Sequence, residues 1–331
     1  MVDQAKVQKE PRKQTRSFDL VTFTRKYGIL LILLCMILFL LTASPTFRTM
    51  QNTINVLNQI SINGIIAIGM SFVIISSGID LSIGSMIAVA SVMAGAVLTT
   101  NPDNVALAVI LAVLACGVIG LFNGFFIAKF DMFPFVVTLG TQLIARGVAY
   151  VISNGKSYVL ESEAFKQIGQ GKLFGTIPYS ILIFATVALI GHILLSRMKY
   201  GQYLYAVGGN VNTATASGVN VFQIRVWTYI MMGLFTGIAG ILLTSRVNAG
   251  QPSIGSGYEL DAIAAVVIGG ASFQGGIGTI PGTIIGILMI GVINNGMNLM
   301  GVSSFYQQIA KGLIILGAVL LDIVISRRKG T

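Results

Sequence analysis

Long apolar runs are the feature that most constrains the fold of this 331-residue chain. The longer runs have about 17–25 residues, enough for a helix to cross a hydrocarbon layer about 30 Å thick. They are continuous and do not alternate with polar residues, which excludes the strand pattern of a membrane β-barrel. We expect about ten spans, at residues 28–43, 57–77, 82–99, 104–128, 133–153, 178–195, 226–244, 260–273, 280–298 and 306–325.

Composition supports this interpretation, because only 10% of the residues are charged, against about 25% in a typical soluble domain. The sequence therefore predicts an all-α integral membrane protein with one transmembrane domain over residues 27–325. The polar ends, residues 1–26 and 326–331, would be tails. Thr42-Ala43-Ser44 resembles a signal-peptidase site, but the basic region before the first run is long for a signal peptide, so we expect this helix to be retained.

The basic residues indicate the orientation of the chain. With the N-terminus inside, fourteen Lys and Arg residues lie in cytoplasmic segments and five lie outside, while Arg146 and Lys311 fall within or at the edge of spans. This bias favours both termini in the cytoplasm. The net charge of +10 therefore reflects membrane orientation and not nucleic-acid binding, for which a basic stripe with interleaved aromatic residues is missing.

Two similar patterns, one in each half of the chain, indicate an internal repeat. The four final positions of the pattern are separated by a constant 172 residues. The expected topology places the two copies in opposite orientations, with units over about 57–153 and 226–325, and inverted repeats are typical of alternating-access transporters. A chance match is the alternative, because Asn, Gly and Phe are common in such chains. The first copy is Gly78-Ile79-Asp80-Leu81, Asn123, Gly124, Phe133 and Gly140, and the second is Gly257-Tyr258-Glu259-Leu260, Asn295, Gly296, Phe305 and Gly312.

The span near 260–273 is too short to cross the membrane as one helix. Residues 260–270 would rise about 16 Å before a stretch with seven glycines in 18 residues. The backbone there is expected to unwind or bend, which needs protein or water to satisfy its polar groups. Close packing of helices through small residues is an equally open alternative.

No hydrolytic, redox or metal site is visible in the sequence. His192 is the only histidine, and metal sites need several His, Cys or carboxylate ligands at fixed spacing. Gly155-Lys156-Ser157 resembles the end of a phosphate-binding loop, but Tyr150 stands where that motif needs glycine. Cys35 and Cys116 lie inside apolar runs and are expected to be small buried hydrophobes. We therefore expect no catalysis and no cofactor in this chain.

Acidic residues precede two of the predicted helices: Asp80 and Ser82 in the first half, and Glu259 and Asp261 in the second. Such groups cap orphan N–H groups and complement the helix dipole. They would also serve as helix-end anchors that hold broken helices in place. Arg146 lies within a span and should face the bundle interior, but the sequence shows no partner for it.

Uncharged polar and aromatic residues follow the second part of the repeat. Amides exchange hydrogen bonds with hydroxyls and aromatic faces stack on sugar rings, so the set suits a neutral, hydroxyl-rich solute. Hydrogen bonding between helices is the alternative for each amide. Carboxylates within the membrane are few, which disfavours proton-coupled transport and favours an external energy source. The candidate pathway residues are Asn123, Phe133, Phe135, Asn294, Asn295, Phe305, Tyr306 and Gln307.

The inner loop, residues 196–225, is long and contains Gly and Asn breaks around a short helical piece near 211–217. Such a helix on the cytoplasmic face would fit into the cleft of a partner. A simple connector between spans is the alternative.

Seven segments carry a common pattern: residues 77–84, 138–140, 146–147, 206–221, 251–270, 294–296 and 301–304. Together they resemble the permease subunits of ATP-binding-cassette importers for monosaccharides, especially the ribose type. The similarity covers most of residues 50–325. Val211, Asn212, Thr213 and Ala216 depart from the pattern, where Glu, Ala, Ala and Leu would be expected, so the contacts with an ATPase stay open.

The resemblance implies a dimer of two identical or related permeases, two cytoplasmic ATPase subunits that bind ATP and Mg²⁺, and an extracytoplasmic sugar-binding protein. Sugar would pass between the permeases, and residues 208–221 would transmit ATP-driven closure. The residues so implied in ATPase coupling are Gly208, Gly209, Asn210, Ala214, Ser217, Gly218, Val219 and Asn220.

We therefore expect a multi-pass permease subunit in the cytoplasmic (inner) membrane of a bacterium, surrounded by lipid, that imports a ribose-like monosaccharide at the expense of ATP hydrolysed elsewhere. A stand-alone secondary carrier is the main alternative. An integral membrane enzyme is a third, but it would need a cluster of titratable or metal-binding groups.

Overall fold

The computed structural model describes the backbone of residues 20–329 and the side chains of residues 28, 30–317 and 319–320. The chain is helical, apart from connecting loops and four two-residue strands. The helices are α1 (Leu20–Ala43), the 3₁₀ helix η1 (Pro45–Arg48), α2 (Met50–Ile75), α3 (Ile83–Thr100), α4 (Val105–Phe130), α5 (Pro134–Ser153), α6 (Glu163–Gln170), α7 (Tyr179–Ser196), α8 (Lys199–Gly209), α9 (Val211–Ala216), α10 (Val221–Val247), α11 (Tyr258–Ile268), α12 (Ile280–Leu299) and α13 (Ser304–Lys329). The strands are β1 (Tyr158–Val159), β2 (Lys172–Leu173), β3 (Ile177–Pro178) and β4 (Ala249–Gly250).

Each of the ten expected spans coincides with a helix, which confirms the all-helical membrane architecture. The count of ten crossings is not confirmed. Among the described residues, seven helices are long and apolar enough to cross a membrane: α2, α3, α4, α5, α7, α10 and α12. Of the others, α1 contributes a shorter apolar stretch, Leu30–Ala43, and α11 has only 11 residues.

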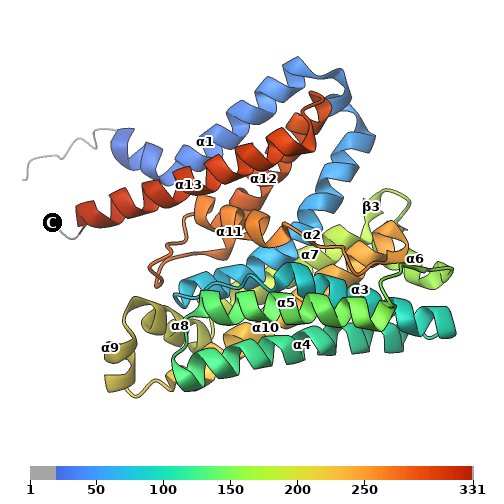
Figure 1. Ribbon diagram of the computed structural model, residues 1–331. Helices are drawn as coiled ribbons and strands as arrows, with labels where there is room; N and C mark the ends of the chain where they lie inside the picture. The colour runs from blue at the N-terminus through green and yellow to red at the C-terminus, as the bar shows by residue number, and fades with distance from the viewer. Residues whose placement is uncertain (1–19, 330–331) are drawn as a thin grey trace, which may run out of the picture.

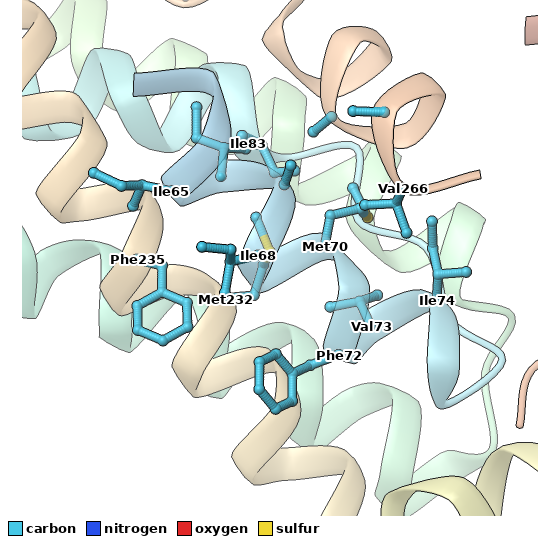
Figure 2. Close-up of a cluster of buried hydrophobic side chains, with 14 of the residues drawn as sticks. Ile65, Ile68, Met70, Phe72, Val73, Ile74, Ile83, Met232, Phe235 and Val266 are labelled. Atoms are coloured by element: carbon cyan, nitrogen blue, oxygen red, sulfur yellow. The ribbon is translucent and has the colours of Figure 1, made fainter. Parts of the chain in front are cut away.

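The helix α2 is the centre of the fold. In its most apolar 18-residue window, 89% of the residues are buried, and it packs against α7, α10, α11 and α12. Figure 2 shows Ile65, Ile68 and Phe72 of α2 close to Met232 and Phe235 of α10. A helix that is apolar on all sides either lies in the core or spans a membrane, and other helices surround most of α2.

The helices α4, α5 and α7 form the outside. The most apolar window of α4 has a mean hydropathy of 2.9, the highest among the seven candidate spans of the described residues, yet only 28% of its residues are buried. The same buried share applies to α5 and α7. Apolar surface of this extent is stable only against hydrocarbon or another apolar chain, so these helices face lipid or a partner.

The order of elements agrees with the proposed repeat, although the repeat itself stays a prediction. In each half a long helix, α2 or α10, is followed by a non-helical connection and then by three helices, α3–α5 or α11–α13. The two long helices pack directly against each other. The halves differ where α11 ends at Ile268, since residues 269–279 are not helical, whereas α3 and α4 are joined by residues 101–104.

Both alternatives for the glycine-rich stretch occur together. The backbone leaves the helix after Ile268, and α11 and α12 also pack closely. A Cβ added at Gly286 would lie only 1.9 Å from the carbonyl oxygen of Ala265, so a side chain at this position would push the two helices apart.

The connections gather at two opposite ends of the molecule. In Figure 1, α8 and α9 lie at the left end and α6 and β3 at the right. β1 pairs with β4, and β2 pairs with β3, both antiparallel. The start of α1 and the end of α13 lie at the same end as α8 and α9 (Figure 1).

The first and last helices extend into the segments expected to be tails, and the bounds of these tails stay predictions. The helix α1 begins at Leu20, within the segment 1–26, and α13 continues to Lys329, within the segment 326–331. Residues 1–19 and 330–331 of these tails lie outside the described residues.

Candidate functional site

The first helix-end anchor is a buried hydrogen-bonded cluster. Asp80 is fully buried in the connection between α2 and α3, and its Oδ1 accepts hydrogen bonds from the backbone N–H of Ser82 (2.8 Å) and its hydroxyl (2.6 Å). The Asn123 side-chain amide of α4 donates to the Ser82 hydroxyl oxygen at 3.0 Å. Burial raises the pKa of Asp80 to about 6, against the opposing effect of the Ser82 hydrogen bonds. The cluster fixes the start of α3 against α4.

The second anchor combines a carboxylate with an ion pair. Glu259 is 8% exposed, and its Oε1 accepts from the backbone N–H of Gly257 at 3.2 Å. The carboxylate of Asp261 on α11 binds Lys311 Nζ of α13 at 2.8 Å. This ion pair attaches the half-length helix α11 to α13.

Arg146 of α5 reaches the loop that precedes α11. Its Nη1 donates to the carbonyl oxygens of Pro252 (2.7 Å) and Ile254 (2.9 Å). Two carbonyls therefore hold the guanidinium for which the sequence showed no partner. They belong to the backbone, so no side-chain pattern in the sequence could have identified them.

The starts of α3 and α11, which are equivalent positions in the proposed repeat, lie side by side. A Cβ added at Gly84 would lie 2.4 Å from the carbonyl oxygen of Gly255 and 2.6 Å from Glu259 Oε2. That Glu259 oxygen is buried and has no hydrogen-bond partner among the described residues. The loop before α11 therefore passes directly over the first turn of α3.

The candidate amides mostly connect helices. Asn295 of α12 and Asn52 of α2 form a reciprocal pair, with N–O distances of 2.8 and 3.1 Å. Gln307 of α13 donates to the side-chain oxygen of Asn298 at 2.8 Å. Asn294 is 3% exposed, and its side-chain oxygen has no partner among the described residues. Together with the buried Asn123, these contacts are the interhelical bonding that the sequence left open as an alternative.

The candidate aromatic residues lie elsewhere, on the surface of the chain. Phe133 and Phe305 are each 79% exposed, Tyr306 is 68% exposed and Phe135 is 50% exposed. Phe133 and Phe135 lie at the start of α5, and Phe305 and Tyr306 lie at the start of α13. Gln307 is the one candidate amide beside these rings, so a single chain does not bring the buried amides and the aromatic rings together in one site.

A cavity of about 170 Å³ lies where α2, α4 and α10 meet near the α8–α9 end. Phe133 lines it, together with Ser77 and an ion pair between Arg225 and Asp131 (2.7 Å). The sequence did not reveal this pair, because its partners are 94 residues apart, with Asp131 in the α4–α5 connection and Arg225 in the helix α10. Among the described residues, no group of three or more His, Cys, Asp or Glu side chains could hold a metal ion.

The inner loop contains two helices. The predicted helical piece near 211–217 is confirmed as α9, which Asn210 caps by accepting from the N–H of Thr213 at 2.9 Å. Asn220 caps α10 in the same way, at 3.0 Å from the N–H of Gln223. The helix α8 was not expected. The remaining residues of the predicted coupling set divide by burial, with Gly208 and Ala214 buried, Val219 half-buried, and Gly209, Ser217 and Gly218 exposed.

Comparison with known proteins gives a consistent result. Residues 52–321 match the family described as "Branched-chain amino acid transport system / permease component". The ribose import permease protein RbsC of Bacillus subtilis (strain 168) is 42% identical over 300 residues, which is 90% of this chain and 92% of the relative. No solved structure matches the chain.

Two further relatives have other sugars in their names. The D-allose transport system permease protein AlsC of Escherichia coli (strain K12) is 37% identical over 321 residues, 96% of this chain and 98% of the relative. The L-arabinose transport system permease protein AraH of the same organism is 37% identical over 306 residues, 92% of this chain and 93% of the relative. The resemblance found in the sequence is therefore confirmed over most of the chain.

Proposed function

The chain belongs to the family of branched-chain amino acid transport system permease components, and on this premise we propose that it is the permease subunit of an ATP-driven importer for a ribose-like monosaccharide. The observation that carries the proposal is the 42% identity to a ribose import permease over 90% of the chain. The allose and arabinose permeases among the relatives support the wider class of neutral monosaccharides.

The charges inside the helix bundle support a sugar over a branched-chain amino acid. A zwitterionic substrate needs one group for its carboxylate and one for its ammonium. Arg146 and Lys311, the two basic residues of α5 and α13 among the described side chains, are already bound to backbone carbonyls and to Asp261. A neutral solute needs no such charges, and hydroxyls exchange hydrogen bonds with amides and carbonyls.

The proposed assembly follows from the family. It comprises two permeases, two ATPase subunits that bind ATP and Mg²⁺, and an extracytoplasmic sugar-binding protein. We place it in the cytoplasmic (inner) membrane of a bacterium, with lipid around α4, α5 and α7. The positive-inside bias supports cytoplasmic termini, and the α8–α9 end would then face the ATPase. The aromatic residues at the starts of α5 and α13 would face the sugar path between two permeases.

The stand-alone secondary carrier is disfavoured as the alternative function. Such a carrier would couple transport to its energy source within this one chain. The relatives at 37–42% identity are instead named as import permeases or as permease proteins of transport systems. An enzyme is disfavoured as well, because these relatives are transport components.

The proposal is tested by rebuilding the importer in liposomes with its ATPase and its binding protein. Labelled ribose, allose, arabinose and leucine are supplied outside, and ATP is enclosed inside. We expect ATP-dependent uptake of at least one of the three sugars, with ribose fastest, and no uptake of leucine. Uptake of leucine with no uptake of any sugar would contradict the proposed substrate class.

A further inference from the structure

Three segments that are far apart in the sequence meet at the α8–α9 end of the molecule. They are the end of α2 at Ile75 and Ser77, the end of α8 at Gly208, and the loop after α11 at Gly275 and Gly276. The Ser77 hydroxyl donates towards the carbonyl oxygens of Gly208 (2.9 Å) and Gln274 (3.0 Å). The Gly276 N–H donates to the carbonyl oxygen of Ile75 at 2.8 Å. We refer to Ile75, Ser77, Gly208, Gly275 and Gly276 as the three-segment junction.

The junction is packed backbone against backbone. A Cβ added at Gly208 would lie 1.7 Å from the Ile75 carbonyl oxygen and 2.6 Å from the Gly276 nitrogen. A Cβ added at Gly275 would lie 2.0 Å from Ser77 Oγ and 2.6 Å from the Gly208 carbonyl oxygen. Since real Cβ atoms do not approach other atoms this closely, any side chain here must displace a backbone segment.

The neighbouring position has no such constraint. Gly209 is exposed, and a Cβ added there would have no atom within 4 Å. Gly209 also has no positive φ, so alanine fits its backbone conformation. The close fit therefore belongs to the face of α8 that meets α2 and the glycine-rich loop.

A second contact fixes α8 to the same loop. The Tyr205 hydroxyl donates to the carbonyl oxygen of Gly278 at 2.6 Å. Ser77 itself has a φ of 61°, a left-handed conformation that is uncommon outside glycine, and its two hydrogen bonds hold it there. The contacts of α8 with Ser77 and with the glycine-rich loop therefore lie along its last turn.

The junction connects an exposed element to the core. On one side, α8 leads through Asn210 directly into α9, whose residues are mostly exposed. On the other side, α2 is the central buried helix, and the glycine-rich loop joins α11 to α12. Backbone contacts have no side-chain rotamers that can absorb a displacement, so a shift of α8 must move α2 or the loop.

From this geometry we infer that the three-segment junction transmits the movement of α8 and α9 to α2 and to the α11–α12 connection. The inference rests on the proposed function, in which α8 and α9 contact the ATPase. Ser77, Tyr205 and Gly208 are positioning residues in this scheme, because they act on the transport path through other residues and do not touch the sugar.

A junction that only stabilises the fold would behave differently from one that transmits movement. Loss of a packing contact lowers the amount and the thermal stability of the complex and leaves the activity of each remaining complex unchanged. Loss of transmission leaves the complex assembled and its basal ATP hydrolysis intact, but hydrolysis no longer responds to the sugar-loaded binding protein.

The test compares Gly208→Ala with the control Gly147→Ala in the complete importer in liposomes, because Gly147 is an exposed glycine of α5 where an added Cβ would have no atom within 4 Å. Four quantities are measured: ATPase recovered with the permease, basal ATP hydrolysis, its stimulation by sugar-loaded binding protein, and uptake per complex. For Gly208→Ala we expect recovery and basal hydrolysis to be retained, while stimulation and uptake fall about tenfold or more. Gly147→Ala is expected to stay within about twofold of the wild type in all four.

Equal stimulation and uptake per complex in the two variants would overturn the inference. If Gly208→Ala does not assemble, Tyr205→Phe decides, since it removes only the hydroxyl that reaches Gly278. A lowered stimulation per complex with unchanged thermal unfolding supports transmission, and unchanged stimulation overturns it. Failure of the wild type to couple uptake to ATP would contradict the proposed function, and the inference with it.

Discussion

One carboxylate oxygen of Asp80 accepts two hydrogen bonds. Its Oδ1 accepts from both the N–H and the hydroxyl of Ser82, and Ser82 in turn accepts from Asn123. These contacts connect the end of the α2–α3 connection to α4 through buried side chains. A buried donor that loses its acceptor costs more free energy than an average hydrogen bond contributes, so the cluster should be sensitive to truncation.

Replacement of Asp80 by alanine leaves the N–H and hydroxyl of Ser82 without their acceptor. We expect Asp80→Ala to lower the free energy of unfolding by about 1–3 kcal/mol. Asp80→Asn keeps an oxygen acceptor and should lose less. Thermal unfolding of the purified protein in detergent measures both, with exposed Asp103→Ala as the matched control. Equal midpoints for Asp80→Ala and Asp103→Ala would contradict the role of the cluster.

Phe133 and Phe305 each present an exposed aromatic ring on the surface of the chain. Both are 79% exposed, so alanine at either position removes little packing within the chain. If these rings face the sugar path, Phe133→Ala and Phe305→Ala should change the transport rate more than the affinity of the binding protein for sugar. Uptake rates and sugar binding by the binding protein are measured separately.

Leu143→Ala is the control for this comparison, because Leu143 is 71% exposed on the same helix as Phe135. Equal uptake rates for both phenylalanine variants, the leucine variant and the wild type would assign Phe133 and Phe305 to packing or lipid contact.

Single residues also show where the sequence was informative. The sequence placed Asp80, Ser82, Glu259 and Asp261 at helix starts, because polar and acidic residues directly before an apolar run are typical of a helix N-terminus. It could not supply the partners of Arg146 or Asn295, because those are a pair of backbone carbonyls and an asparagine 243 residues away. Side-chain pairing depends on tertiary packing, which the local pattern does not encode.

Among the elements, α9 is the short helix that the Asn and Gly breaks in the inner loop predicted. Gly218 follows it with a φ of 82° in open space, so a side chain there strains the backbone but meets no neighbour. We expect Gly218→Glu to abolish coupled transport and to leave membrane insertion intact, because in the proposed assembly the added charge disturbs the surface that α9 presents to the ATPase. Uptake and ATPase recovery measure the effect.

Gly155→Glu is the matched control, since Gly155 also has a positive φ of 70° and open space around it. It follows α5 at the end of the molecule opposite to α9 (Figure 1). Backbone strain alone would affect the two variants alike. Normal uptake by Gly218→Glu would remove this loop from the coupling role.

The elements differ in how well the sequence predicts them. The break after α11 was predictable because glycines are dense there, and α9 because Asn and Gly flank it. The strand pair β1 and β4 was not, since it forms only when residues 158–159 and 249–250 meet in the folded chain. Two-residue strands have no periodicity that a sequence pattern can reveal.

The whole molecule has the form expected of one half of a transport path. Its core surrounds α2, its α4, α5 and α7 surfaces are apolar and exposed, and its candidate aromatic residues are on the outside. The sequence predicted the helical membrane architecture because burial in lipid requires long apolar runs. It could not assemble a substrate site, because the proposed path lies between two chains.

In the proposed function, this chain transports sugar only when a separate ATPase hydrolyses ATP. The most direct measurement is sugar uptake into liposomes that contain the chain, its binding protein and either the active ATPase or a variant that binds ATP without hydrolysing it. We predict accumulation with the active ATPase and ATP, and none with the inactive variant or with the chain alone. Accumulation by the chain alone, or uptake that continues without ATP, would contradict the account.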